Sequence, residues 1–600
     1  MELRRFSLLF VVFAALSCLE SAGAALWSLR PVTDPVPPAS DGVESPIDAF
    51  IRARLQKAGL ILSREADRRT LIRRVTVDLH GLLPTPEEVE DFLNDARPNA
   101  YELVIERLLA SPRYGERRAR HWLDVARYTE SQGFEYDHLR PNGWHYRDYV
   151  IQALNNDKPY DLFVREQIAG DVLSPHSPEA LVATSLLVCG AYDQAGNAQA
   201  NVTQKAISRE DELEDLVSTV GQGVLGITVN CARCHAHKFD PVPQADYYRL
   251  KAVFEGVKHG ERDVRWGGKA STSYVGLRKQ PAPTKVLKRG DVLAPGEEVR
   301  PGGLSAIDEL PSDLGLPADA PEAERRLRFA EWLTDQRNPL TPRVMANRVW
   351  LYHFGQGLVS TPSDFGNSGG TPSHPELLDW LATYLMKNDW SLKAMHRVIL
   401  RSRTYRQSSE WNVAGGERDA DNELLWRFKP LRLDAEVLRD SILAASGSMN
   451  WQMGGPSFRP FEIVTFNSSS YFPKDVSGAE YDRRTIYRAN VNSGKDPLLQ
   501  TLDCPDPSVR TPKRMATITP LQALSLMNNP FVQRESERLA ARVTAETSSP
   551  EKAIARAYEI VLSRPPSADE ARLMRHHAEK QGLASVCWTL FNSTELLYVQ

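Results

Sequence analysis

The sequence predicts a mainly α-helical protein, with two helical domains joined by a glycine- and proline-rich connector that holds a small β element. Apolar residues recur at helical spacing along much of the 600-residue chain. Helix start signals accompany them, such as the capping box that Thr85 and Glu88 form around Pro86. Because a chain of this length exceeds what one ordinary core holds, we expect at least two domains.

The first predicted domain covers residues 45–257. Ser45 can cap its first helix, and Gly59 can end it. The second helix is expected to open at Asp67 and to stop at Gly81. Helical spacing resumes after the capping box, so further helices are expected at 101–110, 117–128 and 146–155.

Residues 258–321 form the predicted connector, where glycine and proline cluster. Within it, Pro283 to Leu293 is the best candidate for a strand. The second helical domain is predicted over 322–600, with residues 454–514 irregular. Its helices are expected at 322–334, 343–353, 375–387, 391–402 and 434–445, followed by two or three between 520 and 597.

The N-terminus has the order of a secretory signal peptide. Two arginines precede an apolar run at 6–16, and Ala22-Gly23-Ala24 supplies a small-residue cleavage signal. The run is too short to cross a bilayer. We therefore predict a signal peptide at 1–24, an extended proline-rich lead-in at 25–44, and a protein exported to the periplasm or beyond, without a stable membrane span.

The cysteines do not suggest a disulfide scaffold. Cys18 invites a lipoprotein anchor, but Leu16 stands one place off the usual position, and a plain signal peptide explains the same residues. Five cysteines remain after cleavage, an odd number at wide spacing. Only Cys231 and Cys234 lie close together.

These two cysteines and His235 spell C-x-x-C-H. On a helix this spacing places all three on one face, as covalent haem requires: two thioether bonds hold the ring edge, and the imidazole ligates the iron. We therefore predict one covalent haem c, with His235 as axial ligand. Two alternatives stay open, a zinc ion held with the help of His237 and a disulfide or a pair of free thiols. Upstream glycines at 221, 223 and 226 permit close approach of a flat ring or of another helix.

A second cluster of polar and aromatic residues is a candidate substrate surface. Flat rings beside arginines and acids are typical of sugar sites, although a buried salt-bridge network uses the same residue types. The predicted substrate-facing residues are His121, Asp124, Arg127 and Tyr128 on one helical face, followed by Glu135, Arg140, Trp144 and Arg147.

Positive charge gathers further along the chain. Arginine forks suit sulfate or carboxylate groups, so an acidic polysaccharide is a candidate partner beside a neutral one, although paired or solvated arginines are commoner. The residues concerned are Arg483, Arg484, Arg488, Arg510, Lys513 and Arg514. The net charge of −4 and the lack of a basic run argue against nucleic acid. His353 is expected to be a cap or core residue without a role in chemistry.

Long motifs along the chain resemble a known family. They are "ADRRTLIRRVTVDLHGLLPTPEEV", "LLASPRYGERRARHWLDVARY", "YRDYVIQALNNDKPYDLFVREQIAGD" and "CARCHAHKFDPVPQADYYRL" in the first half, and "LTPRVMANRVWLYHFGQGLVSTPSDFG", "PSHPELLDWLA", "RSRTYRQSS" and "TITPLQALSLMNNPFV" in the second. With these motifs the chain is similar to the planctomycete cytochrome-C-like family, in which a PSCyt2 domain of unknown function carrying C-x-R-C-H precedes a PSD1 domain of unknown function.

The resemblance implies a haem held by Cys231, Cys234 and His235, in an exported family with a redox or carbohydrate-related role. Ala236 departs from the family pattern C-H-D-H-K-F-D-P, which removes an acid that could support a neighbouring histidine. The sequence has no second C-x-x-C-H, so electrons would have to pass to a separate redox partner.

Together these observations predict an exported c-type haem protein that acts as an oxidoreductase, with carbohydrate as a candidate substrate. A non-catalytic electron-transfer cytochrome is the first alternative. The second is a carbohydrate-binding or scaffold protein whose C-x-x-C-H holds zinc or a disulfide.

Overall fold

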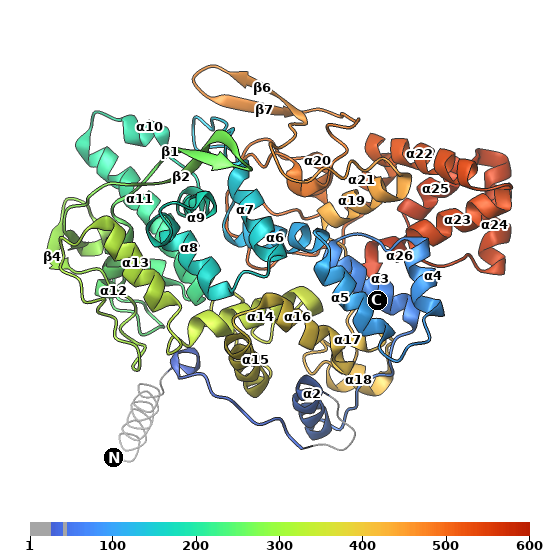
Figure 1. Ribbon diagram of the computed structural model, residues 1–600, viewed down its shortest axis with the longest axis horizontal. Coiled ribbons are helices and arrows are strands. Elements are labelled where there is room, and N and C mark those ends of the chain that lie inside the picture. Colours follow the sequence, from blue (N-terminus) through green and yellow to red (C-terminus); the bar gives the residue numbers. More distant parts are fainter. Residues whose placement is uncertain (1–25, 40–44) are drawn as a thin grey trace, which may run out of the picture.

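The computed structural model describes residues 26–39 and 45–600. Its architecture is helical, with four small two-stranded antiparallel sheets among the described residues (Figure 1). This confirms the predicted fold class. The predicted signal peptide, Cys18 included, lies outside the described residues.

The first half of the chain is helical from residue 46 to residue 254. Asp67 caps the second helix by accepting from the Thr70 amide, and the capping box of Thr85 and Glu88 is present, both as predicted. The helices are α2 (Pro46–Lys57), α3 (Arg68–His80), α4 (Pro86–Asn94), α5 (Ala100–Ala110), α6 (Arg113–Val125), α7 (Trp144–Asn155), α8 (Tyr160–Leu173), α9 (Pro178–Ala183), α10 (Gln194–Ala198), α11 (Val202–Val220) and α12 (Gln244–Phe254).

The connector holds the predicted β element. Strand β1 (Val257–Trp266) pairs with β2 (Lys269–Arg278) around Gly267 and Gly268, which both have positive φ as a tight hairpin turn requires. The predicted strand at 283–293 becomes β3 (Thr284–Leu287), which pairs with β4 (Pro295–Val299).

The second half is again helical. Its helices are α13 (Glu322–Leu333), α14 (Leu340–Phe354), α15 (Pro375–Lys387), α16 (Leu392–Arg401), α17 (Arg403–Arg406), α18 (Val413–Arg418), α19 (Ala435–Ser446), α20 (Pro497–Thr501), α21 (Pro520–Asn528), α22 (Pro530–Glu546), α23 (Pro550–Leu562), α24 (Ala568–Gln581), α25 (Leu583–Phe591) and α26 (Thr594–Leu597). Strand β5 (Leu431–Arg432) pairs with β8 (Tyr598–Val599).

One prediction was wrong within the region expected to be irregular. Strands β6 (Phe461–Thr465) and β7 (Ser469–Pro473) form a hairpin there. Only one residue of β6 and two of β7 are buried, so the sequence lacks the alternation that a strand packed on a core would show.

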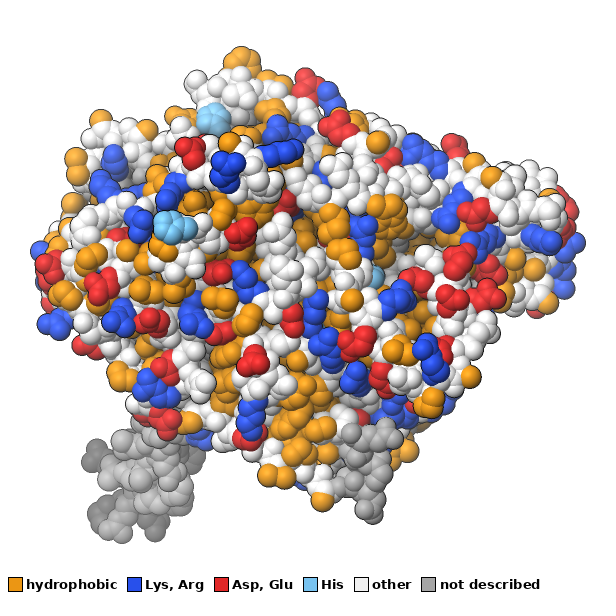
Figure 2. Space-filling view, in the orientation of Figure 1, with side chains coloured by type: hydrophobic (Ala, Val, Ile, Leu, Met, Phe, Trp, Pro, Cys, Tyr) orange, Lys and Arg blue, Asp and Glu red, His pale blue; other side chains and the backbone are white. Residues whose placement is uncertain are grey.

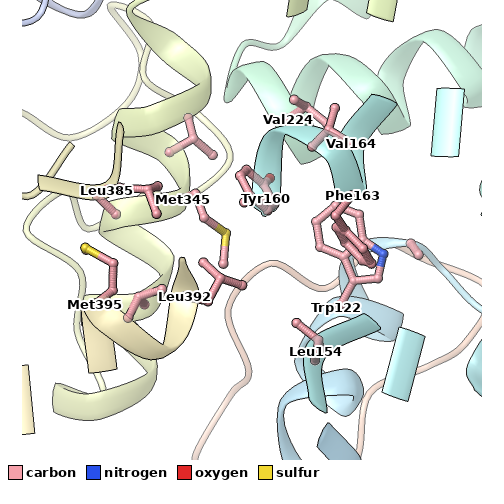
Figure 3. Packing of buried hydrophobic residues seen from close by; sticks show 14 of the residues in the cluster. Trp122, Leu154, Tyr160, Phe163, Val164, Val224, Met345, Leu385, Leu392 and Met395 are labelled. Atoms are coloured by element: carbon pink, nitrogen blue, oxygen red, sulfur yellow. The ribbon is translucent and has the colours of Figure 1, made fainter. Parts of the chain in front are cut away.

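The main hydrophobic core draws on both halves of the chain. Trp122 and Phe163 from the first half belong to the same buried cluster as Met345 and Leu392 from the second (Figure 3). A second core joins α19 with α22, α23 and α25, the helices shown in red in Figure 1, and with Val77 of α3. The packing therefore fixes the two halves against each other.

Acidic and basic side chains are interspersed over the face shown in Figure 2. Among the described residues, no helix has both the length and the apolar character that crossing a membrane needs.

Candidate functional site

The C-x-x-C-H motif lies on a short surface turn. The prediction that the motif lies on one face of an α-helix was wrong. Cys231 belongs to a 3-10 turn, η4 (Val229–Arg233), and Cys234 follows directly after it. In a 3-10 turn, side chains three residues apart eclipse each other, so we expect the side chains of Cys231 and Cys234 to lie on the same side. Both cysteines are exposed and neither forms a disulfide.

The imidazole of His235 is also exposed. Its Nδ1 lies 2.8 Å from the carbonyl oxygen of Ala236. When Nδ1 carries the proton and donates to this oxygen, the lone pair is on Nε2, which is then free to ligate a metal.

The side chain of His237, by contrast, is only 4% exposed. Its Nδ1 accepts from the amide of Asp240 at 2.8 Å and from that of Phe239 at 3.3 Å. The proton is therefore on Nε2, which lies 3.5 Å from the hydroxyl oxygen of Thr228. His237 thus holds the loop that follows His235.

Helices on both sides clamp the turn. The Arg233 guanidinium donates to Asp211 at 2.8 Å and to Glu214, both on α11. The Arg233 carbonyl accepts from Gln244 at 3.0 Å and from Tyr248 at 2.9 Å, both on α12. These contacts leave the two cysteines on the outside of a firmly held backbone.

The upstream glycines serve helix packing. A Cβ at Gly226 would lie 2.6 Å from a methyl group of Val344, so α14 approaches the backbone there. Arg348 of the same helix donates to the carbonyls of Gln222, at 2.9 Å, and Gly223. The sequence predicted that these glycines permit the close approach of a flat ring or of another helix. The structure shows the approach of a helix.

The described residues show no set of ligands assembled for a zinc ion. Within the described residues, no group of three or more His, Cys, Asp and Glu side chains is placed to bind a metal ion. The loop after His235 would have to rearrange for His237 to join, because its Nδ1 already accepts two backbone N–H groups.

The turn offers the groups that a covalent haem would use, two exposed thiols and an exposed imidazole. Phe239, four residues after His235 in the chain, is 56% exposed. At Gly290, where φ is +76°, an added Cβ would lie 3.0 Å from Cys234 Sγ, so glycine leaves room beside this sulfur. An exposed aromatic ring thus follows the motif closely in the chain, and glycine keeps a side chain away from the sulfur of Cys234.

A cavity of about 520 Å³ lies elsewhere in the molecule. Its walls come from α3, α6 and α14, from residues 428–434 and 511–518, and from β8. None of the residues that line it belongs to the C-x-x-C-H turn. The structure thus separates the exposed cysteines from the cavity.

Two of the eight predicted substrate-facing residues line this cavity. His121 is 8% exposed, stacks on Tyr352 with ring centroids 4.1 Å apart, and has no hydrogen-bond partner at Nε2. Burial, together with nearby Arg117 and Arg514, holds the pKa of His121 well below its ordinary value of 6.5, so the ring is neutral at pH 7. Burial raises the pKa of Asp124, which accepts from Arg514 at 2.8 Å.

The other six predicted residues lie outside the cavity. Helix α6 ends at Val125, so Arg127 does not share the helical face of His121 as predicted, and its φ of 50° turns the chain away. The three arginines of the set are buried and bonded within the protein: Arg127 to Asp215, Arg140 to the carbonyls of residues 188–190, and Arg147 to Asp148. Tyr128 is buried, Trp144 is half-buried and Glu135 is exposed.

The predicted cluster of positive charge is largely neutralised inside the protein. Arg484 pairs with Glu116 at 2.8 Å and with Asp440 at 3.0 Å. Arg483 and Arg488 donate to backbone carbonyls, Arg510 pairs with Asp215, and Arg514 pairs with Asp124 and Glu436. Lys513 is exposed and lines the cavity.

The sequence analysis missed a buried chain of hydrogen-bonded side chains beside the cavity. Asp78 accepts from His353 Nδ1 at 2.5 Å, and His353 Nε2 lies 2.7 Å from His396 Nδ1. Arg118 and Tyr405 also donate to Asp78. His353 is a core residue as predicted, but its partners are far away along the chain, and no local motif marks them.

Two families match the chain. PSCyt2, described as a protein of unknown function (DUF1549), matches residues 46–259. PSD1, described as a protein of unknown function (DUF1553), matches residues 325–578. Neither a curated protein nor a solved structure matches the chain.

Proposed function

The chain belongs to the family that joins a PSCyt2 domain to a PSD1 domain, and we propose that it is an exported c-type haem protein that exchanges electrons at its surface. One observation carries this proposal. Cys231 and Cys234 are free and exposed, three residues apart at one short turn, and the exposed imidazole of His235 follows at once. This is the set of groups that covalent haem attachment uses.

Attachment would proceed without loss of atoms. Each thiol adds across one vinyl double bond of the porphyrin: the sulfur bonds to one vinyl carbon, and the hydrogen goes to the other. The adduct therefore has the mass of one haem. Once bound, the group supplies one-electron transfer at a potential set by its axial ligands and its exposure.

The chain's own residues have distinct parts in this proposal. Cys231 and Cys234 would hold the ring edge, and His235 would ligate the iron through Nε2. The apolar side chain of Phe239 would cover part of a ring that is otherwise open to solvent. Such an exposed edge suits electron exchange with a separate partner protein.

Oxidation of a carbohydrate, acidic or neutral, is the second candidate function. It needs an iron position that a substrate or a small molecule can reach. The exposure of the C-x-x-C-H turn favours this candidate. The separation of the turn from the large cavity favours electron transfer, because a ligand in that cavity would not meet the iron.

The first experiment tests attachment. The full chain with its N-terminal segment is expressed together with haem-maturation machinery, and the mass and visible spectrum are measured. We expect a Soret band and one haem adduct on the peptide that contains both cysteines. The C231S/C234S double variant should lack the adduct, whereas Cys504→Ser, which changes a half-buried thiol outside the motif, should keep it. A wild-type protein without an adduct would refute the proposal.

The second experiment separates the two candidate functions. The reduced haem protein is exposed to carbon monoxide. A site with both axial positions filled by protein ligands leaves its spectrum unchanged, as electron transfer predicts. A shifted Soret band, followed by reduction of the oxidised protein by an oligosaccharide, would establish the oxidoreductase instead.

A further inference from the structure

We propose that the cavity between the two halves of the chain binds a small hydroxylated carboxylate of the size of an acidic monosaccharide. This site is separate from the haem proposal and shares no residue with it. The argument rests on the size of the cavity, on a buried polar atom without a partner, on the balance of charge in the walls, and on their aromatic rings.

The cavity has the dimensions of a small-molecule site. Its volume of about 520 Å³ falls within the range of roughly 300 to 1,000 Å³ that such sites occupy. Helices α3 and α6 of the first half and α14 of the second half contribute walls, and the pairing of β5 with β8 brings the end of the chain to the same place. Sites at the junction of two packed units are common among proteins that bind small molecules.

His121 is the strongest indication of a ligand. Its ring is more than nine-tenths buried, yet Nε2 has no hydrogen-bond partner within the described part of the chain. Leaving a buried polar atom unsatisfied costs about 1 to 3 kcal/mol, so such atoms are rare in native proteins. Because the ring is neutral, its Nε2 can form one hydrogen bond with a hydroxyl group of a ligand.

The charge of the walls favours an anion. Each acid that lines the cavity is already neutralised by an arginine: Asp78 by Arg118 at 2.7 Å, Asp124 by Arg514 at 2.8 Å, and Asp434 by Arg117 at 2.7 Å. Two further cations, Lys429 and Lys513, line the cavity without a carboxylate partner among the described residues.

Arg74 also lines the cavity, but its donors are already used within the protein. It is buried and donates to the main-chain oxygens of Gln600, at 2.8 Å, Gln407, at 2.9 Å, and Tyr405. Its guanidinium lies 3.6 Å from the ring centroid of Phe428. Lys429 and Lys513 are exposed, so their side chains can move toward a ligand. A carboxylate in the cavity is therefore attracted by two exposed lysines whose charge no carboxylate of the described residues offsets.

Aromatic rings complete the site. Tyr352, Tyr405, Phe428 and Tyr598 line the same cavity. Flat rings suit the apolar faces of a pyranose, while the cations and the imidazole address its carboxylate and hydroxyl groups. Inorganic anions would satisfy the charge but would leave the rings and His121 unused.

The test measures binding by calorimetry in the C231S/C234S protein, which keeps it independent of haem. The probes are galacturonate, galactose as the neutral analogue, and inorganic sulfate. We expect galacturonate to bind at least ten-fold more tightly than either of the others. The K429A/K513A double variant should lose at least ten-fold in galacturonate affinity, and Lys552→Ala, an exposed lysine on α23, should lose nothing.

A second variant tests the hydrogen bond. His121→Phe retains a flat ring against Tyr352 but removes the ring nitrogens, and it should weaken galacturonate binding several-fold while the thermal midpoint changes little. Failure of galacturonate to bind the wild-type protein would overturn the proposal. So would equal binding of sulfate and galacturonate, or an affinity that neither the lysine nor the histidine variant changes.

Discussion

The carboxylate of Asp78 on α3 lies 2.5 Å from the imidazole Nδ1 of His353 on α14, across 275 residues of sequence. The contact joins the first half of the chain to the second inside the main core. Since His353 also contacts His396, and Arg118 donates to Asp78, the four helices α3, α6, α14 and α16 are linked through this carboxylate.

Replacing Asp78 should therefore destabilise the whole protein. In Asp78→Ala, the buried Arg118 loses its carboxylate and His353 loses its acceptor, and breaking a buried pair in this way costs about 3 to 5 kcal/mol. The free energy of unfolding, measured by urea denaturation, should fall by that amount. Asp569→Ala is the control, because its ion pair with Arg572 is more than 80% exposed and should contribute less than about 1 kcal/mol. Equal losses in both variants would contradict the assigned role.

Gly290 should control access to the sulfur of Cys234. Alanine at this position would be strained at φ +76° and would bring a methyl group to 3.0 Å from the sulfur. Gly268 has a similar φ of +80° but open space around it, so Gly268→Ala is a matched control. We expect both variants to lose about 1 kcal/mol of stability. Only Gly290→Ala should slow the reaction of Cys234 with a thiol reagent. Peptide mass spectrometry measures the rate of this reaction. Equal rates in both variants would argue against the predicted crowding.

Stability should fall as the pH drops from 6.5 to 4. Burial lowers the pKa of His80 and of His374 from 6.5 to about 4, with Arg54 adding to the effect at His374. Between these values the unfolded chain binds protons at both sites and the folded chain does not, so protonation favours unfolding. Each histidine contributes at most about 1.4 kcal/mol per pH unit in this window.

The slope can be assigned with two variants. His374→Gln removes one titrating group, and the thermal midpoint should then depend less steeply on pH between 6.5 and 4. The side chain of His576 is 62% exposed, so His576→Gln should leave the slope as in the wild type. A slope unchanged in His374→Gln would mean that other groups cause the loss.

The two halves should not fold independently. Trp122 and Phe163 of the first half are buried in a cluster that contains Met345 and Leu392 of the second. A fragment of residues 26–321 would expose its side of this cluster, at a cost of roughly 1.5 to 3 kcal/mol for each large apolar side chain. Calorimetry of the fragment should show no cooperative transition, while residues 26–600 should show one. A sharp transition of the fragment near the midpoint of the longer chain would refute this expectation.

Most of the helices could be predicted from the sequence, because their signals are local. The capping box at Thr85, the N-terminal cap at Asp67 and the span 375–387 of α15 all lie where the pattern placed them. The C-x-x-C-H motif could be found for the same reason, since its three residues are neighbours in the chain. The hairpin of β6 and β7 was missed, because few of its residues face a core.

The sequence by itself determined the helical class, the punctuation of the helices and the one cysteine motif, since all three depend on spacings of a few residues. Only the tertiary structure decided which predicted site residues meet. It placed His121 and Asp124 at a cavity, locked Arg127, Arg140 and Arg147 into internal contacts, and joined Asp78 to His353. The physical reason is that a buried polar group must find its partner wherever packing brings one, and packing acts between segments hundreds of residues apart.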